Sequence, residues 1–302
     1  MASTSRHIFP GLLWAATAIF IWSGSLILLR LGVSTGLTAY DLTALRFGVA
    51  AAILLPVILR QGFSVHSPGW IPAPVLIALF GAPYVLMLSL AVKTAPAAAT
   101  GALNPGVMAI AAIIIARVSE RQPLTPARRT GIALTALGVS GFVLTGGGIS
   151  AGHMVLMATG VMWAGYAAVI RATRLPALSA TALVAVGSAV LYLPVYAVAL
   201  PKQIAATSLP DLLLQVFFQG FLVTTVAVYA FNRSAELLGS VAATSLPALM
   251  PVVTLGLEVL VVGQTLTSGE MISACLVTAG IALLLAGPAL AAILRRRSSA
   301  GK

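Results

Sequence analysis

The sequence predicts an all-α integral membrane protein with ten transmembrane helices, arranged as two inverted repeats of five helices each. Three observations lead to this prediction: an apolar composition with few charges, about ten apolar runs of membrane-spanning length, and an internal repeat. The repeat divides the 302 residues into two expected units, 1–148 and 149–302.

The composition is far more apolar than that of a soluble domain. Hydrophobic residues make up 60% of the chain and charged residues 8%, whereas soluble domains carry about 25% charged residues. The mean hydropathy is +1.06. Short loops separate the apolar runs, so little sequence remains for a soluble domain.

Each expected span is an apolar run of roughly 20 residues, the length that crosses a bilayer as a helix. We expect helices at 9–29, 40–59, 70–91, 97–116, 129–146, 153–170, 178–199, 211–231, 241–262 and 271–293.

The basic residues are distributed unevenly between the two sets of loops. With the N-terminus placed inside, 13 of the 17 Lys and Arg residues lie in cytoplasmic segments, 3 lie in outer loops and 1, Arg46, lies within a span. The positive-inside rule therefore predicts that both termini are cytoplasmic. The formal net charge of +11 is thus explained by topology and anionic-lipid contact, and nucleic-acid binding is a remote alternative.

Two local features do not change this interpretation. Arg6 followed by an apolar run could indicate a signal peptide, but the segment has an uncleaved counterpart in mid-chain. Cys275 is the one cysteine, which excludes a disulfide within the chain and a thiolate metal site.

The internal repeat is the most informative pattern. "WSGSLILLR" from Trp22 aligns with "WAGYAAVIR" from Trp163, an offset of 141 residues. "TALRFGVAAAILLP" from Thr43 aligns with "TALVAVGSAVLYLP" from Thr181, an offset of 138. "AATGALNP" resembles "AATSLPALMP" if a gap of two residues is allowed, and Gly138 aligns with Gly280. Because each half has an odd number of spans, the second copy must enter the membrane from the opposite side. Secondary transporters share this architecture, with the substrate site at the repeat interface.

Several short motifs, in this order and spacing, resemble the EamA family of the drug/metabolite transporter superfamily. They are Trp22-Ser23-Gly24, Leu45-Arg46-Phe47, "ALNP" at Ala102–Pro105 followed by Glu120, and the glycines Gly138 and Gly280. The resemblance implies ten helices, cytoplasmic termini and ATP-independent export of small organic metabolites such as amino acids. It also implies a multi-pass protein of the bacterial cytoplasmic (inner) membrane. An uptake permease of the same fold and a membrane-embedded enzyme or scaffold are the alternatives.

The second half departs from the first at two charged positions. Val184 replaces the repeat partner of Arg46, and Gln264 stands near the position expected for an acidic partner of Glu120. Any role of those charges is therefore not duplicated.

Motifs for other chemistries are missing from the sequence. There is no nucleotide-binding G-x-x-x-x-G-K-[ST], and the six acidic residues and three histidines are dispersed without metal-ligand spacing. We therefore expect no enzyme activity, no cofactor, no metal and no ATP. The expected partners are a small-molecule substrate and the lipid bilayer, with no nucleic acid, and the chain is expected to be a monomer or a weak homodimer.

Two charged residues lie within expected spans, where charges are costly and often functional. Arg46 and Glu258 are candidates for coupling or gating: they could pair in a cavity, or Glu258 could exchange a proton. Alternatively, Arg46 extends to the outer headgroups and Glu258 lines a wet vestibule. Glu236 lies three residues after Arg233, and a local ion pair explains it.

The candidate cavity lining consists of aromatic and uncharged polar residues away from the span ends. A polar stripe on a membrane helix turns towards other helices or water. Helix packing is the alternative for each residue. The candidates for substrate binding are Trp22, Tyr84, Asn104, Trp163, Tyr166, Gln219, Thr225, Tyr229 and Asn232.

Prolines interrupt two expected spans, because a proline removes a backbone donor. Pro105 and Pro251 are therefore candidate hinges, with a packing kink as the alternative. The expected lining suits small amphipathic or zwitterionic solutes, possibly aromatic amino acids, or a drug-like cation held over aromatic faces. Phosphorylated solutes fit poorly, because several convergent cationic residues would be needed.

Overall fold

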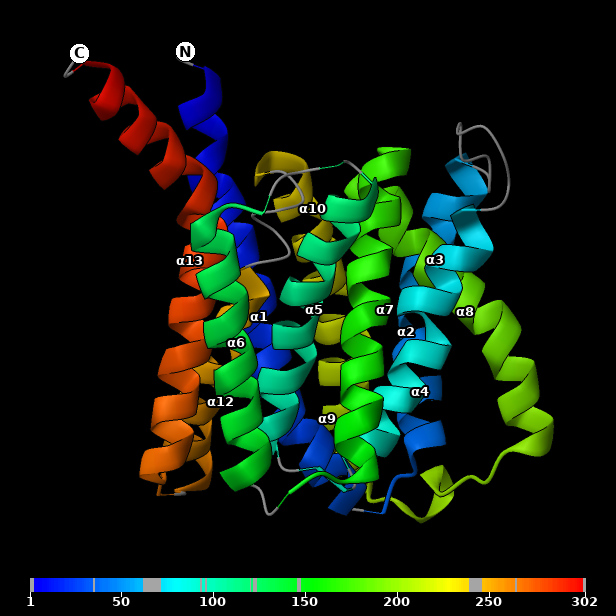
Figure 1. The fold of residues 1–302 in the computed structure, drawn as a ribbon. Helices are drawn as coiled ribbons and strands as arrows, with labels where there is room; N and C mark the ends of the chain where they lie inside the picture. The colour runs from blue at the N-terminus through cyan, green and yellow to red at the C-terminus, as the bar shows by residue number, and fades with distance from the viewer. Residues whose placement is uncertain are drawn as a thin grey trace.

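The computed structural model describes residues 3–34, 36–61, 72–92, 94–95, 97–119, 121, 124–145, 148–238, 246–263 and 265–300. Within these residues every regular element is helical, and the helices form one bundle (Figure 1). The all-α prediction is therefore confirmed for the described part of the chain.

Seven helices in the described ranges are long and apolar enough to cross a membrane. They are Ile8–Leu28, Ala39–Gln61, Ala73–Ala91, Gly101–Ser119, Ala151–Thr173, Ala177–Ala199 and Leu209–Leu238. Two shorter apolar helices follow, Met250–Val261 and Ser268–Leu284.

The described residues of the first half form six helical elements. They are α1 (Ser3–Ser34), α2 (Ala39–Gln61), α3 (Pro72–Phe80), α4 (Ala82–Ala91), α5 (Ala97–Ser119) and α6 (Pro126–Thr145).

The second half contains more irregular turns. Its elements are α7 (Ala151–Thr173), α8 (Ala177–Ala199), η1 (Ile204–Ala206), α9 (Leu209–Gln215), η2 (Val216–Ala227), α10 (Val228–Leu238), η3 (Leu246–Leu249), α12 (Met250–Leu257), η4 (Glu258–Val262) and α13 (Ser268–Ala300).

A break at Gly81 divides the third expected span into α3 and α4. Pro83 has no amide hydrogen and cannot continue the helical ladder. The freed amide of Ala82 donates to Ser188 Oγ of α8 at 3.1 Å. A Cβ at Gly81 would lie 2.2 Å from that same oxygen, so the close approach requires glycine.

Two stretches have the wide turns of a π-helix instead of α-helical turns. The first, η2, occupies the middle of the expected eighth span, and the second, η4, begins at Glu258. In η2 the hydroxyls of Thr224 and Thr225 each donate to the carbonyl five residues earlier, at Gln219 and Gly220. Residues in such turns face different directions from those that an α-helical spacing predicts.

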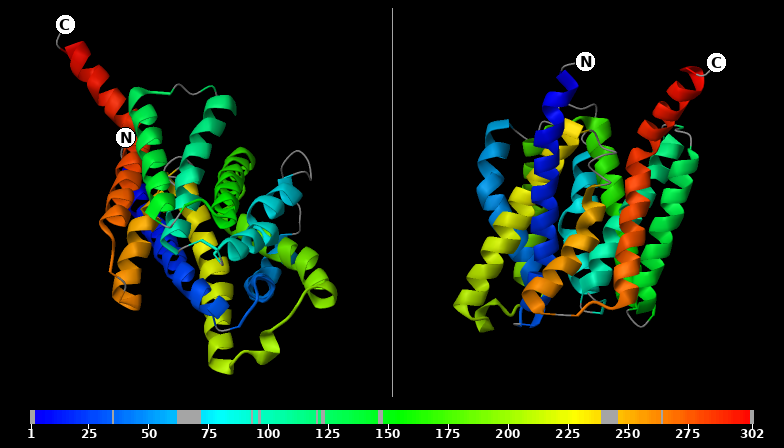
Figure 2. Two further views of the ribbon diagram at one scale, coloured as in Figure 1. Left: turned by 60° about the horizontal axis from the view of Figure 1, so that its bottom comes forward. Right: turned by 90° about the vertical axis from the view of Figure 1, so that its left-hand side faces the viewer.

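The start of α1 and the end of α13 lie at the same end of the bundle. The views in Figures 1 and 2 agree that α1 starts and α13 ends there, beyond the ends of the neighbouring helices. The helices α2, α5 and α7 also end on this side, so it carries Arg60, Arg117 and Arg171. The charge asymmetry expected from the sequence is thus an asymmetry between the two ends of the bundle.

The helix contacts keep the same pattern when the two halves are exchanged. Helix α2 packs against its repeat partner α8, and α6 packs against its repeat partner α13. Helix α1 packs against α10, and its repeat partner α7 packs against α3 and α4. Likewise α5 contacts α7, and α12 contacts α1. The repeat seen in the sequence is therefore also a repeat of packing.

Small residues bring α6 and α13 into backbone contact. A Cβ at Gly138 would lie 2.7 Å from the carbonyl oxygen of Ser273, and one at Gly280 would lie 2.6 Å from the amide nitrogen of Thr135. Both views in Figure 2 draw these two helices side by side. Small residues at such crossings let membrane helices approach closely enough for strong van der Waals contact.

One expected asymmetry cannot be located: Glu120 and Gln264 lie outside the described residues.

We predict that Gly138→Ala destabilises the bundle, because the added methyl group meets backbone atoms of α13 that have no room to move. Overpacking of this kind costs about 1–3 kcal/mol. The measurement is the thermal unfolding midpoint of the purified protein in detergent.

The matched control is Gly256→Ala in α12, where a Cβ meets no atom within 4 Å. This variant should melt at or slightly above the wild-type midpoint, since alanine favours helix. Equal midpoints for the two variants would contradict the close α6–α13 packing.

Candidate functional site

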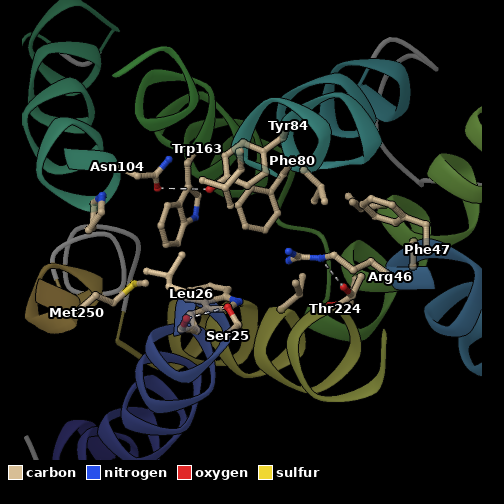
Figure 3. A pocket seen from close by; sticks show the side chains of 18 residues that line it. Ser25, Leu26, Arg46, Phe47, Phe80, Tyr84, Asn104, Trp163, Thr224 and Met250 are labelled. Carbon is tan, nitrogen blue, oxygen red and sulfur yellow. Dashed lines mark hydrogen bonds between the residues drawn. The ribbon is translucent and has the colours of Figure 1, made fainter. Parts of the chain in front are cut away.

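A cavity lies in the middle of the bundle, between the two repeats (Figure 3). Its volume is about 50 Å³, which is room for a few water molecules. Its walls come from both halves of the chain. The lining residues are Trp22, Ser25, Leu26, Arg46, Phe47, Phe80, Tyr84, Val85, Leu88, Asn104, Pro105, Trp163, Thr181, Val184, Ala185, Thr224, Val228 and Met250.

Four pairs of repeat partners line the cavity together. Trp22 and Trp163 meet edge to face, with ring centroids 4.9 Å apart and an interplanar angle of 87°. The other pairs of lining residues are Arg46 with Val184, Phe47 with Ala185, and Asn104 with Met250. Equivalent positions of the two halves therefore face one common space.

Aromatic rings form one wall of the cavity. The ring of Phe80 lies 5.6 Å from that of Trp163 and 4.8 Å from that of Tyr84. Tyr166 stacks on Phe80 from behind, at 4.5 Å and 17°. Phe231 packs behind both tryptophans, 5.6 Å from Trp22 and 5.7 Å from Trp163. Edge and face contacts of this kind hold rings in fixed orientations.

The wall contains one buried donor without a hydrogen-bond partner among the described residues, the indole nitrogen Nε1 of Trp163. An unsatisfied buried donor costs roughly 1–3 kcal/mol. A hydrogen-bond acceptor inside the cavity could recover part of that cost after a small rotation of the ring.

Asn104 links three helices at the edge of the cavity. Its Oδ1 accepts from the hydroxyl of Tyr84 at 3.3 Å, and its Nδ2 donates to Thr159 Oγ1 at 2.7 Å. Asn104 precedes Pro105, and a Cβ on Gly160 of α7 would lie 2.7 Å from the Asn104 carbonyl oxygen. These contacts fix the side chains of Asn104 and Tyr84 where α4, α5 and α7 meet.

A second asparagine, Asn232, makes analogous hydrogen bonds behind the residues that line the cavity. Asn232 accepts from the hydroxyl of Tyr166 at 3.1 Å and donates to Thr181 Oγ1 at 3.0 Å. Thr181 lines the cavity, whereas Asn232 and Tyr166 do not. Asn232 and Tyr166 therefore support lining residues from behind.

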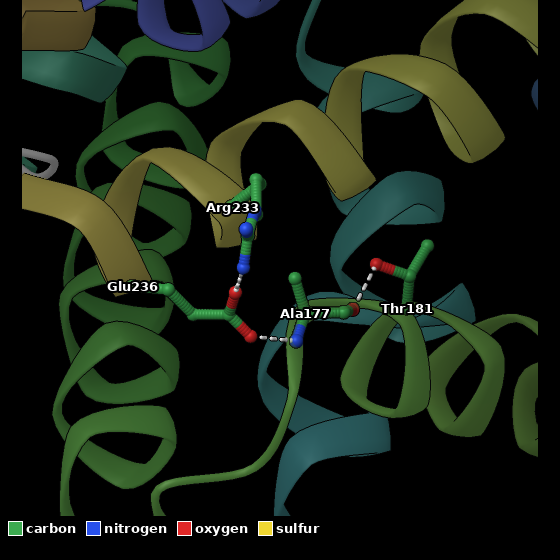
Figure 4. A network of polar contacts seen from close by, with 4 residues as sticks. All are labelled: Ala177, Thr181, Arg233 and Glu236. Carbon is green, nitrogen blue, oxygen red and sulfur yellow. Dashed lines mark hydrogen bonds and ion pairs between the residues drawn. The ribbon is translucent and has the colours of Figure 1, made fainter. Parts of the chain in front are cut away.

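The start of α8 is held in place by α10 (Figure 4). The backbone N–H of Ala177 donates to Glu236, which also pairs with Arg233. One turn on, the hydroxyl of Thr181 donates to the carbonyl of Ala177 at 2.7 Å. The local ion pair expected for Glu236 is confirmed, and the carboxylate also caps α8.

Arg46 reaches into the cavity from the side opposite Trp163 (Figure 3). Its side chain is 6% exposed, so it does not extend to the headgroups as the alternative interpretation requires. Its Nε donates to Thr224 Oγ1 at 3.2 Å. In the part of the chain that the structure describes, no carboxylate forms an ion pair with it.

The remaining polar contacts near Arg46 join α1 to η2. The hydroxyl of Thr224 donates to the carbonyl of Gln219 at 2.8 Å, and Gln219 Nε2 donates to the carbonyl of Ser25 at 3.3 Å. Ser25 lines the cavity and its hydroxyl donates to the carbonyl of Trp22. Gln219 thus lies behind the lining and ties it together.

The structure brings together six of the candidate residues predicted from the sequence. Those that line the cavity are Trp22, Arg46, Tyr84, Asn104, Pro105 and Trp163. Tyr166, Gln219 and Asn232 bond or stack on lining residues without lining it themselves.

Four other candidates lie away from the cavity lining. Thr225 and Tyr229 are displaced by the wide turns of η2, so Thr224 and Val228 take the lining positions. Tyr229 packs instead on Trp14, with ring centroids 5.5 Å apart. Glu258 is 4% exposed but is not a lining residue, and among the described residues no ion pair joins it to Arg46, which was one of the alternatives. Pro251 is also outside the lining, where Met250 stands.

Several lining residues were not predicted from the sequence. Ser25 lies one turn after Trp22, and Phe80 lies one turn before Tyr84, so helical spacing from the chosen aromatics could have found both. Thr181 and Thr224 carried no such signal. Their placement depends on the start of α8 and on the turns of η2.

Metal-ligating side chains do not gather at this site. Over the described residues no three or more His, Cys, Asp or Glu side chains are grouped so that they could hold a metal ion.

The family model for the EamA-like transporter family matches the chain twice, over residues 9–144 and 150–286. A solved structure described only as "Crystal structure of protein" is similar, with a TM-score of 0.67 and 23% sequence identity, covering 97% of this chain and 98% of that one. At this identity the likeness shows a shared fold alone. No curated protein matches the chain. Because the two family matches cover most of the chain, one in each half, the chain belongs to the EamA-like transporter family.

Proposed function

We propose that this protein is a secondary transporter that moves small amphipathic solutes, such as amino acids and related compounds, through the central cavity by alternating access. The observation that carries the proposal is that repeat partners from the two halves line one cavity, with Trp22 against Trp163 at its centre. Secondary transporters built from inverted repeats bind substrate at this interface.

The proposal includes ten spans in two inverted sets of five. The seven apolar helices of spanning length supply seven of them, and α6, the segment from Leu246 to Val262, and α13 supply the others. Helix α1 begins at the end of the bundle that carries the termini, whereas its repeat partner α7 begins at the opposite end (Figure 1). The exchange symmetry of the helix contacts supports the same arrangement.

We assign the end with Arg60, Arg117 and Arg171 to the cytoplasm of a bacterial cell, on the positive-inside rule. Transport is then proposed to run from this side outwards, as the exporters that the sequence resembles do. Uptake through the same fold is the alternative. Solute flux in right-side-out and inverted vesicles separates the two directions.

The size of the cavity supports a mechanism with moving walls. Drug-sized ligands occupy pockets of about 300–1,000 Å³, and this cavity holds only a few water molecules. A solute of amino-acid size therefore requires the repeats to move apart. The helix break at Gly81 and the prolines Pro105 and Pro251 are the proposed hinges. The ladder of backbone hydrogen bonds is interrupted at the first two, and Pro251 lies in the first turn of α12, directly after η3.

We predict that Trp163→Ala lowers solute flux in proteoliposomes by about tenfold or more, because the aromatic wall loses its central ring. A panel of amino acids and aromatic metabolites, tested with and without a pH gradient, provides the solutes.

The matched control is Trp14→Ala on α1, whose ring packs on Tyr229 outside the cavity lining. This variant should retain flux if it elutes as a folded protein. Equal flux for Trp163→Ala and wild type would refute transport through this cavity.

Glu258 remains the proposed proton-exchanging group, because it is a buried acid within a membrane helix. Glu258→Gln should remove the dependence of flux on the pH gradient while leaving downhill flux. Glu270→Gln, at the start of α13, is the control and should keep that dependence. An unchanged gradient dependence in Glu258→Gln would exclude this coupling role.

A further inference from the structure

We propose that the cavity selects organic monocarboxylates with an aromatic or apolar body, that Arg46 binds the carboxylate, and that an amino group on the solute is not required. This inference rests on the proposed function and specifies the chemical class of its substrate.

The cavity carries a positive charge. Arg46 is the one charged residue among the described residues of the lining, and within that part of the chain its side chain makes one hydrogen bond, from Nε to the hydroxyl of Thr224. A guanidinium carries five N–H donors. The others have no carboxylate among the described residues. A buried cation without a counter-ion is costly, and a solute carboxylate can remove that cost through two parallel hydrogen bonds.

The acidic residues that the structure describes lie away from the cavity lining. Asp41 is held at the start of α2 by Tyr196 and Gln203. Glu236 pairs with Arg233, and Asp211 and Glu270 lie in the first turns of α9 and α13.

Glu258 is buried in η4 and does not line the cavity, and Glu120 lies outside the described residues. Among the described residues the lining therefore holds no acid that could pair with a solute ammonium group, and such a group would face the positive charge of Arg46.

An aromatic wall lies opposite Arg46. The rings of Phe80 and Trp163 (Figure 3), with the ring of Trp22 against Trp163, offer apolar faces and edges to the body of a solute. The unpartnered indole N–H of Trp163 adds another donor. The guanidinium of Arg46 and the indole of Trp163 both present hydrogen-bond donors that need a partner, so the cavity favours a solute that carries a hydrogen-bond acceptor. One guanidinium can neutralise one carboxylate, which disfavours phosphate esters and dicarboxylates.

The experiment compares three solutes that share a phenyl ring and differ only in charge. 3-Phenylpropanoate carries a carboxylate alone, phenylalanine carries a carboxylate and an ammonium group, and phenethylamine carries an ammonium group alone. Binding to the purified full-length protein in detergent is measured by titration calorimetry. We expect 3-phenylpropanoate to bind at least as tightly as phenylalanine, and phenethylamine to bind much more weakly.

Arg46→Gln should lower the binding affinity for 3-phenylpropanoate and phenylalanine by about 30-fold or more, because one partner of a buried charge pair is lost. The same variant should leave phenethylamine unchanged or tighter. Arg46→Lys should restore part of the affinity, since a cation returns without the bidentate geometry. Arg60→Gln, on the same helix but at its end, is the matched control and should bind all three solutes as wild type does.

Phenethylamine binding as tightly as 3-phenylpropanoate would overturn the inference, and this comparison needs only the wild-type protein. Equal carboxylate affinities in folded Arg46→Gln and wild type would also overturn it. A different result would refute the proposed function. Trp163→Ala should weaken the binding of all three solutes together. If binding depended on Trp163 but not on the charge of the solute, only the carboxylate preference would be refuted, and the assignment as a transporter would stand.

Discussion

The hydrocarbon core of a bilayer offers no hydrogen-bond partners, so polar side chains in the middle of a spanning helix turn towards partners inside the protein. This constraint accounts for the centre of the bundle. Asn104 and Asn232 each join helices through two hydrogen bonds, and Gln219 connects η2 to α1. Because these polar groups share the interior with Arg46, the space between the repeats is held open as a cavity with a defined lining.

The two repeats share a packing plan but contribute different chemistry to that cavity. The tryptophans Trp22 and Trp163 are equivalent and face each other. At two further pairs the first half supplies the polar member, Arg46 or Asn104, and the second half supplies Val184 or Met250, whereas Phe47 and Ala185 are both apolar. Symmetric packing allows the halves to exchange their arrangements during transport. The asymmetric lining concentrates the positive charge on one wall, which gives the site a direction in which a solute can lie.

The sequence was sufficient to predict the class of fold, the repeat and much of the cavity wall. Trp22, Tyr84, Asn104 and Trp163 could be selected because interfacial belts place most aromatic residues at span ends, and polar side chains in mid-span turn inwards. The side of the eighth span that faces the cavity could not be predicted, because an α-helical period points to Thr225 whereas the π-helical turns present Thr224. The break at Gly81 is likewise stabilised by Ser188, far away in the chain. Such features depend on tertiary contacts that no local pattern carries.

In the proposed mechanism the cavity between the repeats is reached in turn from both faces of the membrane. The most direct test is the labelling of Val184→Cys, in a background where Cys275 is replaced by serine, with a membrane-impermeant thiol reagent applied to either face of oriented vesicles. Val184 lines the cavity, whereas Ala182 on the same helix is buried against α2 and serves as the control position. We expect the thiol reagent to modify Val184→Cys from both faces of the membrane, and a transported solute to slow the reaction from either face. Ala182→Cys should stay unmodified. Modification from one face only, or equal rates at the two positions, would contradict the proposed mechanism.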